Sequence, residues 1–190
     1  MKLNRRDILL GASMAGAALI TPSYAIANNK TVIERLKPVI TPELRMWNAN
    51  NDERMSSVFF RDGAYVEQEL KRIDWFMRDW RQAEVKTLDR ELLWALAAIR
   101  EAAMGDGHHG EIRFLSGYRS TKTNNLLRSR GGGAARNSLH IKAKAIDFSL
   151  PGIPVGAVSQ YASWLELGGV GHYPGSFTHI DTGSIRSWTG

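Results

Sequence analysis

Apolar side chains recur every three or four residues in two segments of the first half of the chain. The first segment contains Leu70, Ile73, Phe76 and Met77, and the second contains Leu92, Leu93, Leu96, Ile99 and Ala103. This spacing predicts two amphipathic helices. Asp89 is placed to cap the second helix, and Gly105 to end it. We expect Trp75, Trp80 and Trp94 to be core aromatics of these helices.

The pattern changes after Gly110, where short apolar runs alternate with loops rich in Gly, Ser, Asn and Arg. The runs at 112–115, 145–150, 170–173 and 177–180 predict strands, and residues 57–60 predict another, followed by a turn. We expect residues 128–133 to form a mobile surface loop. The predicted class is therefore α+β, with a small antiparallel sheet that carries the functional loops and packs against several helices.

The N-terminus has a basic start, an apolar run over residues 8–20 and small residues at 25–27. This three-part pattern predicts a signal peptide over residues 1–27, with cleavage after Ala27 or, as a second choice, Ala25. The pair Arg5-Arg6 favours the twin-arginine export route over the general secretory route. We expect a lead-in segment over residues 28–56, polar and unpacked over residues 28–45, and one domain over residues 57–190.

The amino-acid composition limits the kinds of catalytic group that the chain can use. A net charge of +6 suits an anionic polymer without identifying it. The chain has no cysteine, which excludes disulfides, thiolate zinc sites and a cysteine nucleophile. It also lacks the G-x-S-x-G and S-x-x-K patterns of serine nucleophiles. Catalysis would therefore depend on a metal or on paired acids and bases.

Two predicted strands each carry an aspartate close to a histidine in sequence. His140 lies seven residues before Asp147, and His179 lies two residues before Asp181. Asp147 on the polar face of an exposed strand is the simple alternative. If the two strands are neighbours, all four side chains meet at one spot. Two histidines and one carboxylate would then hold one zinc ion and leave a fourth position for water.

The motifs around these residues resemble the zinc peptidases of the M15 type. They are S-x-H-x6-D over residues 138–147, SGYRS over 116–120 and FTHID over 177–181. The segments FFRDGAYVEQEL and GGVGHYPGSFTHIDTG, with the N-terminal signal, resemble more narrowly a murein endopeptidase group within that family. The resemblance covers residues 57–188 and implies the fold of lysostaphin-type enzymes and the hedgehog domain.

The resemblance implies that His140, Asp147 and His179 are the zinc ligands. It also implies that Arg119 reaches the substrate, where a guanidinium can hold a carboxylate or steady an oxyanion. A structural arginine that pairs with a nearby carboxylate is the alternative. Ser138 either binds near the metal and substrate or caps its loop.

This chain departs from the family pattern at two places. Ala143 replaces the usual glycine, although the odd offset between His140 and Asp147 requires a bend there. Relatives also carry a general base two or three residues before the last ligand, where this chain has Ser176 and Phe177. Asp181 is the preferred replacement base, with His172 as the alternative, and Asp181 could instead orient a ligand.

We expect a periplasmic zinc peptidase that cleaves murein cross-links, with peptidoglycan as its partner. The rival functions are a D,D- or L,D-carboxypeptidase that trims stem peptides and an inactive wall-binding module. We expect no nucleic-acid binding and no membrane span after signal cleavage. The sequence predicts no particular protein partner.

Overall fold

A seven-stranded sheet forms the centre of the computed structural model, which describes residues 31–131 and 133–190. Its strands lie in the order β2-β1-β5-β6-β8-β7-β9. Neighbours run antiparallel except for the pairs β1–β5 and β7–β9. The strands are β1 (Glu43–Asn48), β2 (Arg54–Val58), β5 (Ile112–Ser116), β6 (Ala145–Ser149), β7 (Gly169–Tyr173), β8 (Phe177–Asp181) and β9 (Arg186–Thr189). The predicted α+β class with a mostly antiparallel sheet is confirmed, although the sheet is larger than expected.

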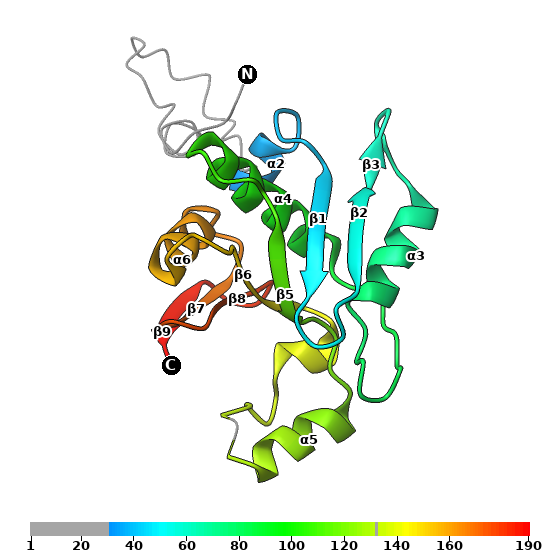
Figure 1. Cartoon of the computed structure of the whole chain (residues 1–190), viewed down its shortest axis with the longest axis vertical. Coiled ribbons are helices and arrows are strands. Elements are labelled where there is room, and N and C mark those ends of the chain that lie inside the picture. Colours follow the sequence, from blue (N-terminus) through cyan, green and yellow to red (C-terminus); the bar gives the residue numbers. More distant parts are fainter. Residues whose placement is uncertain (1–30, 132) are drawn as a thin grey trace, which may run out of the picture.

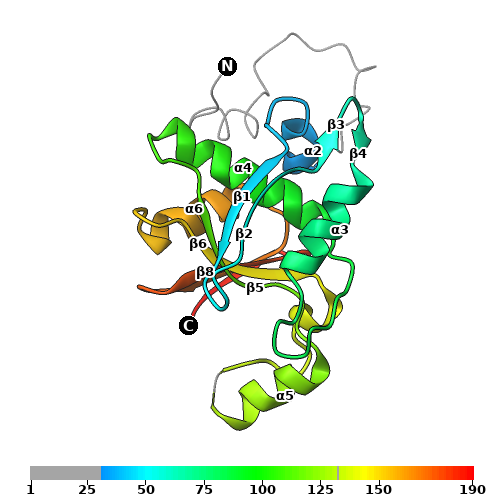
Figure 2. The same cartoon turned by 45° about the vertical axis from the view of Figure 1, so that its right-hand side comes forward.

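Five helices surround this sheet (Figures 1 and 2). They are α2 (Val32–Leu36), α3 (Glu67–Phe76), α4 (Arg90–Gly105), α5 (Thr121–Ser129) and α6 (Val155–Trp164), with a short 3-10 helix η1 (Leu139–Lys142) and a small hairpin of β3 (Phe60–Arg61) and β4 (Ala64–Tyr65). Helix α4 contacts β1 and α6, and α6 contacts β7 and β8. These helices cover one face of the sheet, where Phe114, Phe148 and Ile180 are buried.

The segment expected to be an unpacked lead-in belongs to the core. Val32, Ile33 and Leu36 of α2 are buried, and α2 packs on α4. A reciprocal pair of hydrogen bonds between Thr31 and Glu34 caps this helix. β1 then pairs with both β2 and β5. The expectation was wrong because an apolar stripe one turn long has too few positions to show a period.

The two long helices form where the periodicity predicts them. The Asp89 carboxylate accepts a hydrogen bond from the backbone N–H of Glu91, so the predicted N-cap is present. Trp94 is buried against Phe59 and Phe60. Of the other two tryptophans expected in the core, Trp75 is 52% exposed and Trp80 is 38% exposed. Both were expected in the core; instead, the guanidinium groups of Arg78 and Arg81 cover their rings.

The predicted mobile loop at 128–133 is partly helical. Arg128 and Ser129 form the last turn of α5, and Gly132 lies outside the described residues. Figures 1 and 2 show α5 projecting beyond the rest of the molecule. The predicted signal peptide also lies outside the described residues. In the part of the chain that the structure describes, no helix has the length and apolar character needed to cross a membrane.

Candidate metal centre

Asp147 and His179 lie opposite one another on neighbouring strands. β6 and β8 pair antiparallel, and their register places Asp147 directly beside His179. Paired residues point to the same face of a sheet, and here it is the face opposite α6. Asp147 is only 7% exposed, which rules out the alternative of an ordinary surface aspartate.

His140 reaches the same place through a bend in the chain. Residues 139–142 form η1, and Ala143 then adopts a left-handed conformation with φ 55° and ψ 35° before β6 begins. The predicted bend is therefore present. It brings His140 beside Asp147 although their offset is odd. Ala143 is fully buried and pays backbone strain of about 1–2 kcal/mol for this conformation.

Three side chains converge at this point. His179 Nδ1 is 2.7 Å from Asp147 Oδ1, and His140 Nε2 is 3.2 Å from Asp147 Oδ2. The two ring nitrogens are 3.3 Å apart. All three candidate ligand atoms lie within 4.8 Å of one another, so the group has the size of a metal site.

The outer nitrogens of both rings already have hydrogen-bond acceptors. His140 Nδ1 donates to the carbonyl oxygen of Gly117 at 2.7 Å, and His179 Nε2 donates to Asp181 Oδ2 at 3.1 Å. When both rings are neutral, the inner nitrogens therefore present lone pairs toward the carboxylate of Asp147. Three acceptors at such distances require a proton or a metal ion among them. The residues present fit a metal ion, with both histidines oriented as ligands usually are.

The ionisation of the three groups follows from this geometry. Burial lowers the pKa of His140 despite the attraction of Asp147. Burial also raises the pKa of the Asp147 carboxyl, but attraction and hydrogen bonding to His140 and His179 outweigh this and hold it well below its usual range. For His179, hydrogen bonds to Asp147 and Asp181 outweigh burial and raise the pKa to about 9. The metal-free site thus retains a proton that a metal would displace.

Asp181, the preferred general base, lies behind His179 with its oxygens occupied. Its side chain has no exposed surface. Oδ1 accepts from the backbone N–H groups of Gly169 and Gly183 at 3.0 and 2.8 Å, and Arg186 donates to both oxygens at 3.0 and 2.6 Å. Burial raises the pKa of Asp181, but these bonds and His179 hold it well below its usual range. The geometry favours the orienting role over the role of base.

His172, the alternative base, points to the other face of the sheet. It is paired with Thr178 in the β7–β8 ladder, one position away from the pair of Gly171 with His179. Its ring lies 3.2 Å from the Ser159 hydroxyl of α6. Because successive residues of a strand alternate between faces, His172 is turned away from the metal centre. This position favours Asp181 over His172 as the residue that acts at the centre.

Arg119 lies beside the three converging side chains. Its guanidinium is largely buried, 3.1 Å from the Ser116 hydroxyl and 3.4 Å from Asp147 Oδ2. Burial lowers its pKa while Asp147 opposes this effect. The Ser138 hydroxyl accepts from the backbone N–H of His140 at 3.4 Å and so caps η1, at the edge of the same cavity.

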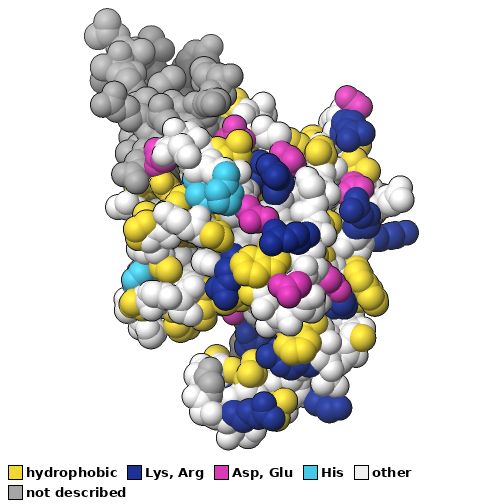
Figure 3. Space-filling view, in the orientation of Figure 1, with side chains coloured by type: hydrophobic (Ala, Val, Ile, Leu, Met, Phe, Trp, Pro, Cys, Tyr) yellow, Lys and Arg dark blue, Asp and Glu magenta, His cyan; other side chains and the backbone are white. Residues whose placement is uncertain are grey.

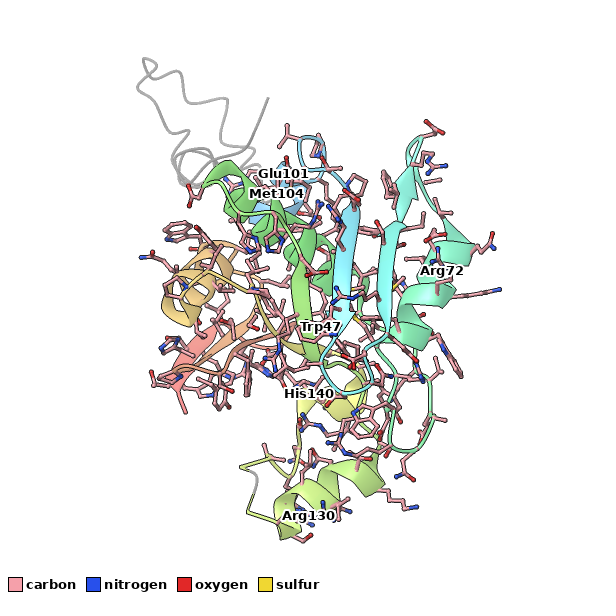
Figure 4. All side chains as sticks on the ribbon, viewed as in Figure 1. Trp47, Arg72, Glu101, Met104, Arg130 and His140 are labelled. Atoms are coloured by element: carbon pink, nitrogen blue, oxygen red, sulfur yellow. The ribbon has the colours of Figure 1, made fainter. Side chains whose placement is uncertain are left out.

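An open cavity of about 310 Å³ lies over the centre. Tyr173, Phe177 and Trp188 form an aromatic wall of this cavity that the motifs did not predict. Tyr173 stacks on Phe177, and the Trp188 indole donates to the Tyr173 hydroxyl at 3.1 Å. Figure 4 marks His140 near the base of the projecting α5 segment. The alternation of β7 could have identified Tyr173, but Trp188 enters only through the parallel pairing of β9.

The α+β fold thus places two histidines and a buried aspartate, a group that could bind a metal ion, at the base of an open cavity. Comparison with known proteins identifies the family. Residues 38–188 match the M15 peptidase family model described as peptidoglycan L,D-endopeptidase MepK. The chain belongs to this family and is a peptidase.

Similar proteins span nearly the whole chain. Peptidoglycan L,D-endopeptidase MepK of Escherichia coli (strain K12) is 36% identical over 186 residues, which cover 97% of both proteins. The protein of the same name from Shigella flexneri gives the same figures. A probable MepK of Haemophilus influenzae is 38% identical and covers 98% of this chain and 96% of its own length.

Proposed function

We propose that this protein is a zinc-dependent endopeptidase that cleaves peptide cross-links of peptidoglycan. The observation that carries the proposal is the convergence of His140, Asp147 and His179 in a chain that aligns with MepK proteins over nearly its full length. The names of those relatives support the substrate. The basic surface described below is consistent with an anionic wall polymer.

His140 Nε2, Asp147 and His179 Nδ1 would hold the ion. A zinc ion at such a site supplies Lewis-acid chemistry, which acidifies water to a pKa of roughly 7 and polarises a carbonyl. Asp181 and the Gly117 carbonyl fix the ring orientations and tautomers of the two histidines. The three protein groups leave the cavity side open for substrate.

Arg119 is the charged donor nearest the centre and would act on the substrate. Its position beside Asp147 suits it to stabilise negative charge that develops on the scissile carbonyl oxygen. A guanidinium with restricted access to water is effective in this role because little solvent screens it. The aromatic wall of Tyr173, Phe177 and Trp188 would pack against the apolar parts of the peptide and exclude water from one side of the site.

We also propose that residues 1–27 are a twin-arginine signal and that the protein acts in the periplasm. Action on peptidoglycan requires a location outside the cytoplasm. The twin-arginine route carries folded proteins, which would allow the metal site to form before export. Since α2 packs on α4, we place the start of the folded domain at α2 and not at residue 57.

Digestion of purified murein tests the proposal. We expect the wild-type protein with zinc to convert cross-linked dimers into monomers, and we expect chelation or the substitution Asp147→Ala to prevent this. Unchanged dimers with shortened monomer stems would identify a carboxypeptidase instead. Binding to murein without hydrolysis in the presence of any divalent metal would identify an inactive binding module.

A further inference from the structure

The positive charge of this protein is concentrated in one segment. Between Glu111 and Asp147 the chain has no Asp or Glu. The same stretch carries eight basic residues, namely Arg113, Arg119, Lys122, Arg128, Arg130, Arg136, Lys142 and Lys144. The remainder of the chain mixes both signs. This asymmetry indicates a specific electropositive surface and not a uniformly basic protein.

Four of these residues lie on the projecting segment formed by α5 and the chain that returns from it, which we call the basic arm (residues 120–131 and 133–138). They are Lys122, Arg128, Arg130 and Arg136, and all four are exposed. Figure 3 shows Lys and Arg side chains on this arm at the bottom of the view, and Figure 4 places Arg130 near its outer end.

The charges of the arm are not neutralised by neighbours. Among the ion pairs of the described residues, none includes Lys122, Arg128, Arg130 or Arg136. Some basic residues elsewhere are paired, as Arg54 is with Glu111 at 2.6 Å, whereas others, such as Arg35 and Arg45, form no ion pair among the described residues. Four unpaired cations close together repel one another, which costs stability and gains nothing within the fold. An external anion removes that cost.

The arm is held firmly to the body at its base. The buried carboxylate of Asp79 accepts hydrogen bonds from the Ser120 backbone at 2.9 Å and the Ser120 hydroxyl at 2.6 Å. Further along α5, the buried side chain of Asn124 donates to the carbonyl oxygen of Ala135 at 3.0 Å. These bonds join the outgoing helix to the returning chain. The arm therefore presents its charges in a defined place relative to the metal centre.

The returning chain is also a wall of the catalytic cavity. Ala134, Ala135, Asn137 and Ser138 line the cavity that contains His140, Asp147 and His179. The basic surface is thus continuous with the candidate active site. A polymer bound along the returning chain would therefore lie next to the cavity that holds the three candidate ligands.

We propose that the basic arm is an electrostatic docking surface for the peptidoglycan polymer, whose stem peptides carry repeated carboxylates. This inference rests on the proposed function. It explains how an enzyme with one small active site stays bound to a very large polymer. Charge complementarity favours this occupant. A lipid surface is less suited to the arm because its only large exposed apolar side chain, Leu126, is 37% exposed, whereas membrane-surface helices insert a broad apolar face.

Co-sedimentation with purified sacculi tests the surface. The variant K122Q/R128Q/R130Q/R136Q is compared with R35Q/R45Q/R61Q/K71Q, which removes the same charge from exposed positions of the body. We expect the arm variant to bind sacculi at least about tenfold more weakly than wild type at low ionic strength, and the body variant to change binding by less than about twofold. The difference should vanish near 1 M salt. Equal binding by the two variants would overturn the proposal.

Two further measurements identify the ligand and separate this inference from the proposed function. Sacculi whose carboxylates have been amidated should lose the arm-dependent binding. Arm-dependent binding to phosphatidylglycerol vesicles but not to sacculi would overturn the proposal in favour of a membrane. Hydrolysis of a small, soluble cross-linked muropeptide dimer reports on catalysis alone.

The proposed function fails if the wild-type protein does not cleave this dimer. The docking surface fails if the wild-type protein cleaves the dimer and the arm variant binds sacculi normally.

Discussion

His179 and Asp181 form a hydrogen-bonded pair on one strand, with His179 Nε2 3.1 Å from Asp181 Oδ2. Arg186, Gly169 and Gly183 surround the aspartate from behind. The pair fixes which ring nitrogen of His179 faces the cavity. The sequence left two roles open for Asp181, a general base and a residue that orients His179. Substitution distinguishes them, because loss of a base lowers catalysis whereas loss of an orienting residue lowers metal affinity.

Replacing Asp181 with asparagine should weaken metal binding. The amide keeps the size of the side chain but removes the charge that supports His179 as a ligand, and such changes typically cost roughly 10- to 100-fold in metal affinity. We expect activity to recover when zinc is raised in proportion. Metal content after dialysis, with activity measured against zinc concentration, checks this. An inactive enzyme with undiminished zinc affinity would instead make Asp181 the base.

Replacing His172 with glutamine should leave catalysis intact. The ring lies on the face covered by α6, close to Ser159, and is not among the residues that line the cavity. We expect kcat/KM on a soluble muropeptide dimer to stay within about twofold of wild type. His179→Gln, one pair along the same ladder but on the cavity face, is the matched comparison and should lose both metal and activity. A large fall in kcat for His172→Gln at normal stability would restore His172 as a catalytic residue.

Metal affinity should rise with pH up to about pH 9. In the metal-free protein His179 has a pKa of about 9, so at neutral pH it holds a proton that zinc must displace. Below that pKa, each unit of pH should strengthen apparent affinity about tenfold, and above it the gain should stop. Asp147, whose pKa is held low, adds no dependence in this range. Calorimetry in buffers of different ionisation enthalpy should detect about one proton released per zinc near pH 7. A pH-independent affinity between pH 7 and 9 would contradict this.

Ala143 should tolerate glycine and resist a larger side chain. Glycine relieves the left-handed strain of about 1 kcal/mol but loses a buried methyl group worth about 0.8 kcal/mol, so the free energy of unfolding should hardly change. Valine adds volume at a fully buried position, which costs about 1–3 kcal/mol, and a β-branched residue strongly disfavours positive φ. Thermal unfolding with zinc titration measures both effects. Equal stability of the two variants would show that this bend is not constrained.

Replacing Asp79 with alanine should loosen the basic arm. The substitution leaves the Ser120 backbone N–H without its buried acceptor, at a cost of about 1–3 kcal/mol. Hydrogen exchange should accelerate in α5 more than in α4. Glu67→Ala, at an exposed first-turn position of α3, serves as the control. Unchanged exchange in α5 would show that Asp79 does not anchor the arm.

The local pattern of apolar and polar residues was sufficient to predict several helices and strands. The three- and four-residue period identified α3 and α4, and the alternation around Asp147 and His179 identified β6 and β8. It also required the bend before Asp147, which the structure places at Ala143. These inferences succeed because helices and strands impose their periods on a few adjacent residues.

The tertiary structure decided what those periods leave open. Strand alternation and pairing place His172 and His179 on opposite faces of the sheet. Only the packing of α6 on β7 and β8 determines which of the two faces is covered. The proposal that Asp181 orients His179 rests on its contacts with Arg186 and with the backbone amides of Gly169 and Gly183, which occupy its oxygens in the folded chain. The burial of α2 depends likewise on contact with α4. The sequence by itself determined which chemical groups are available and their local spacing, whereas long-range packing decided which of them meet, because burial and strand neighbours depend on residues far apart in the chain.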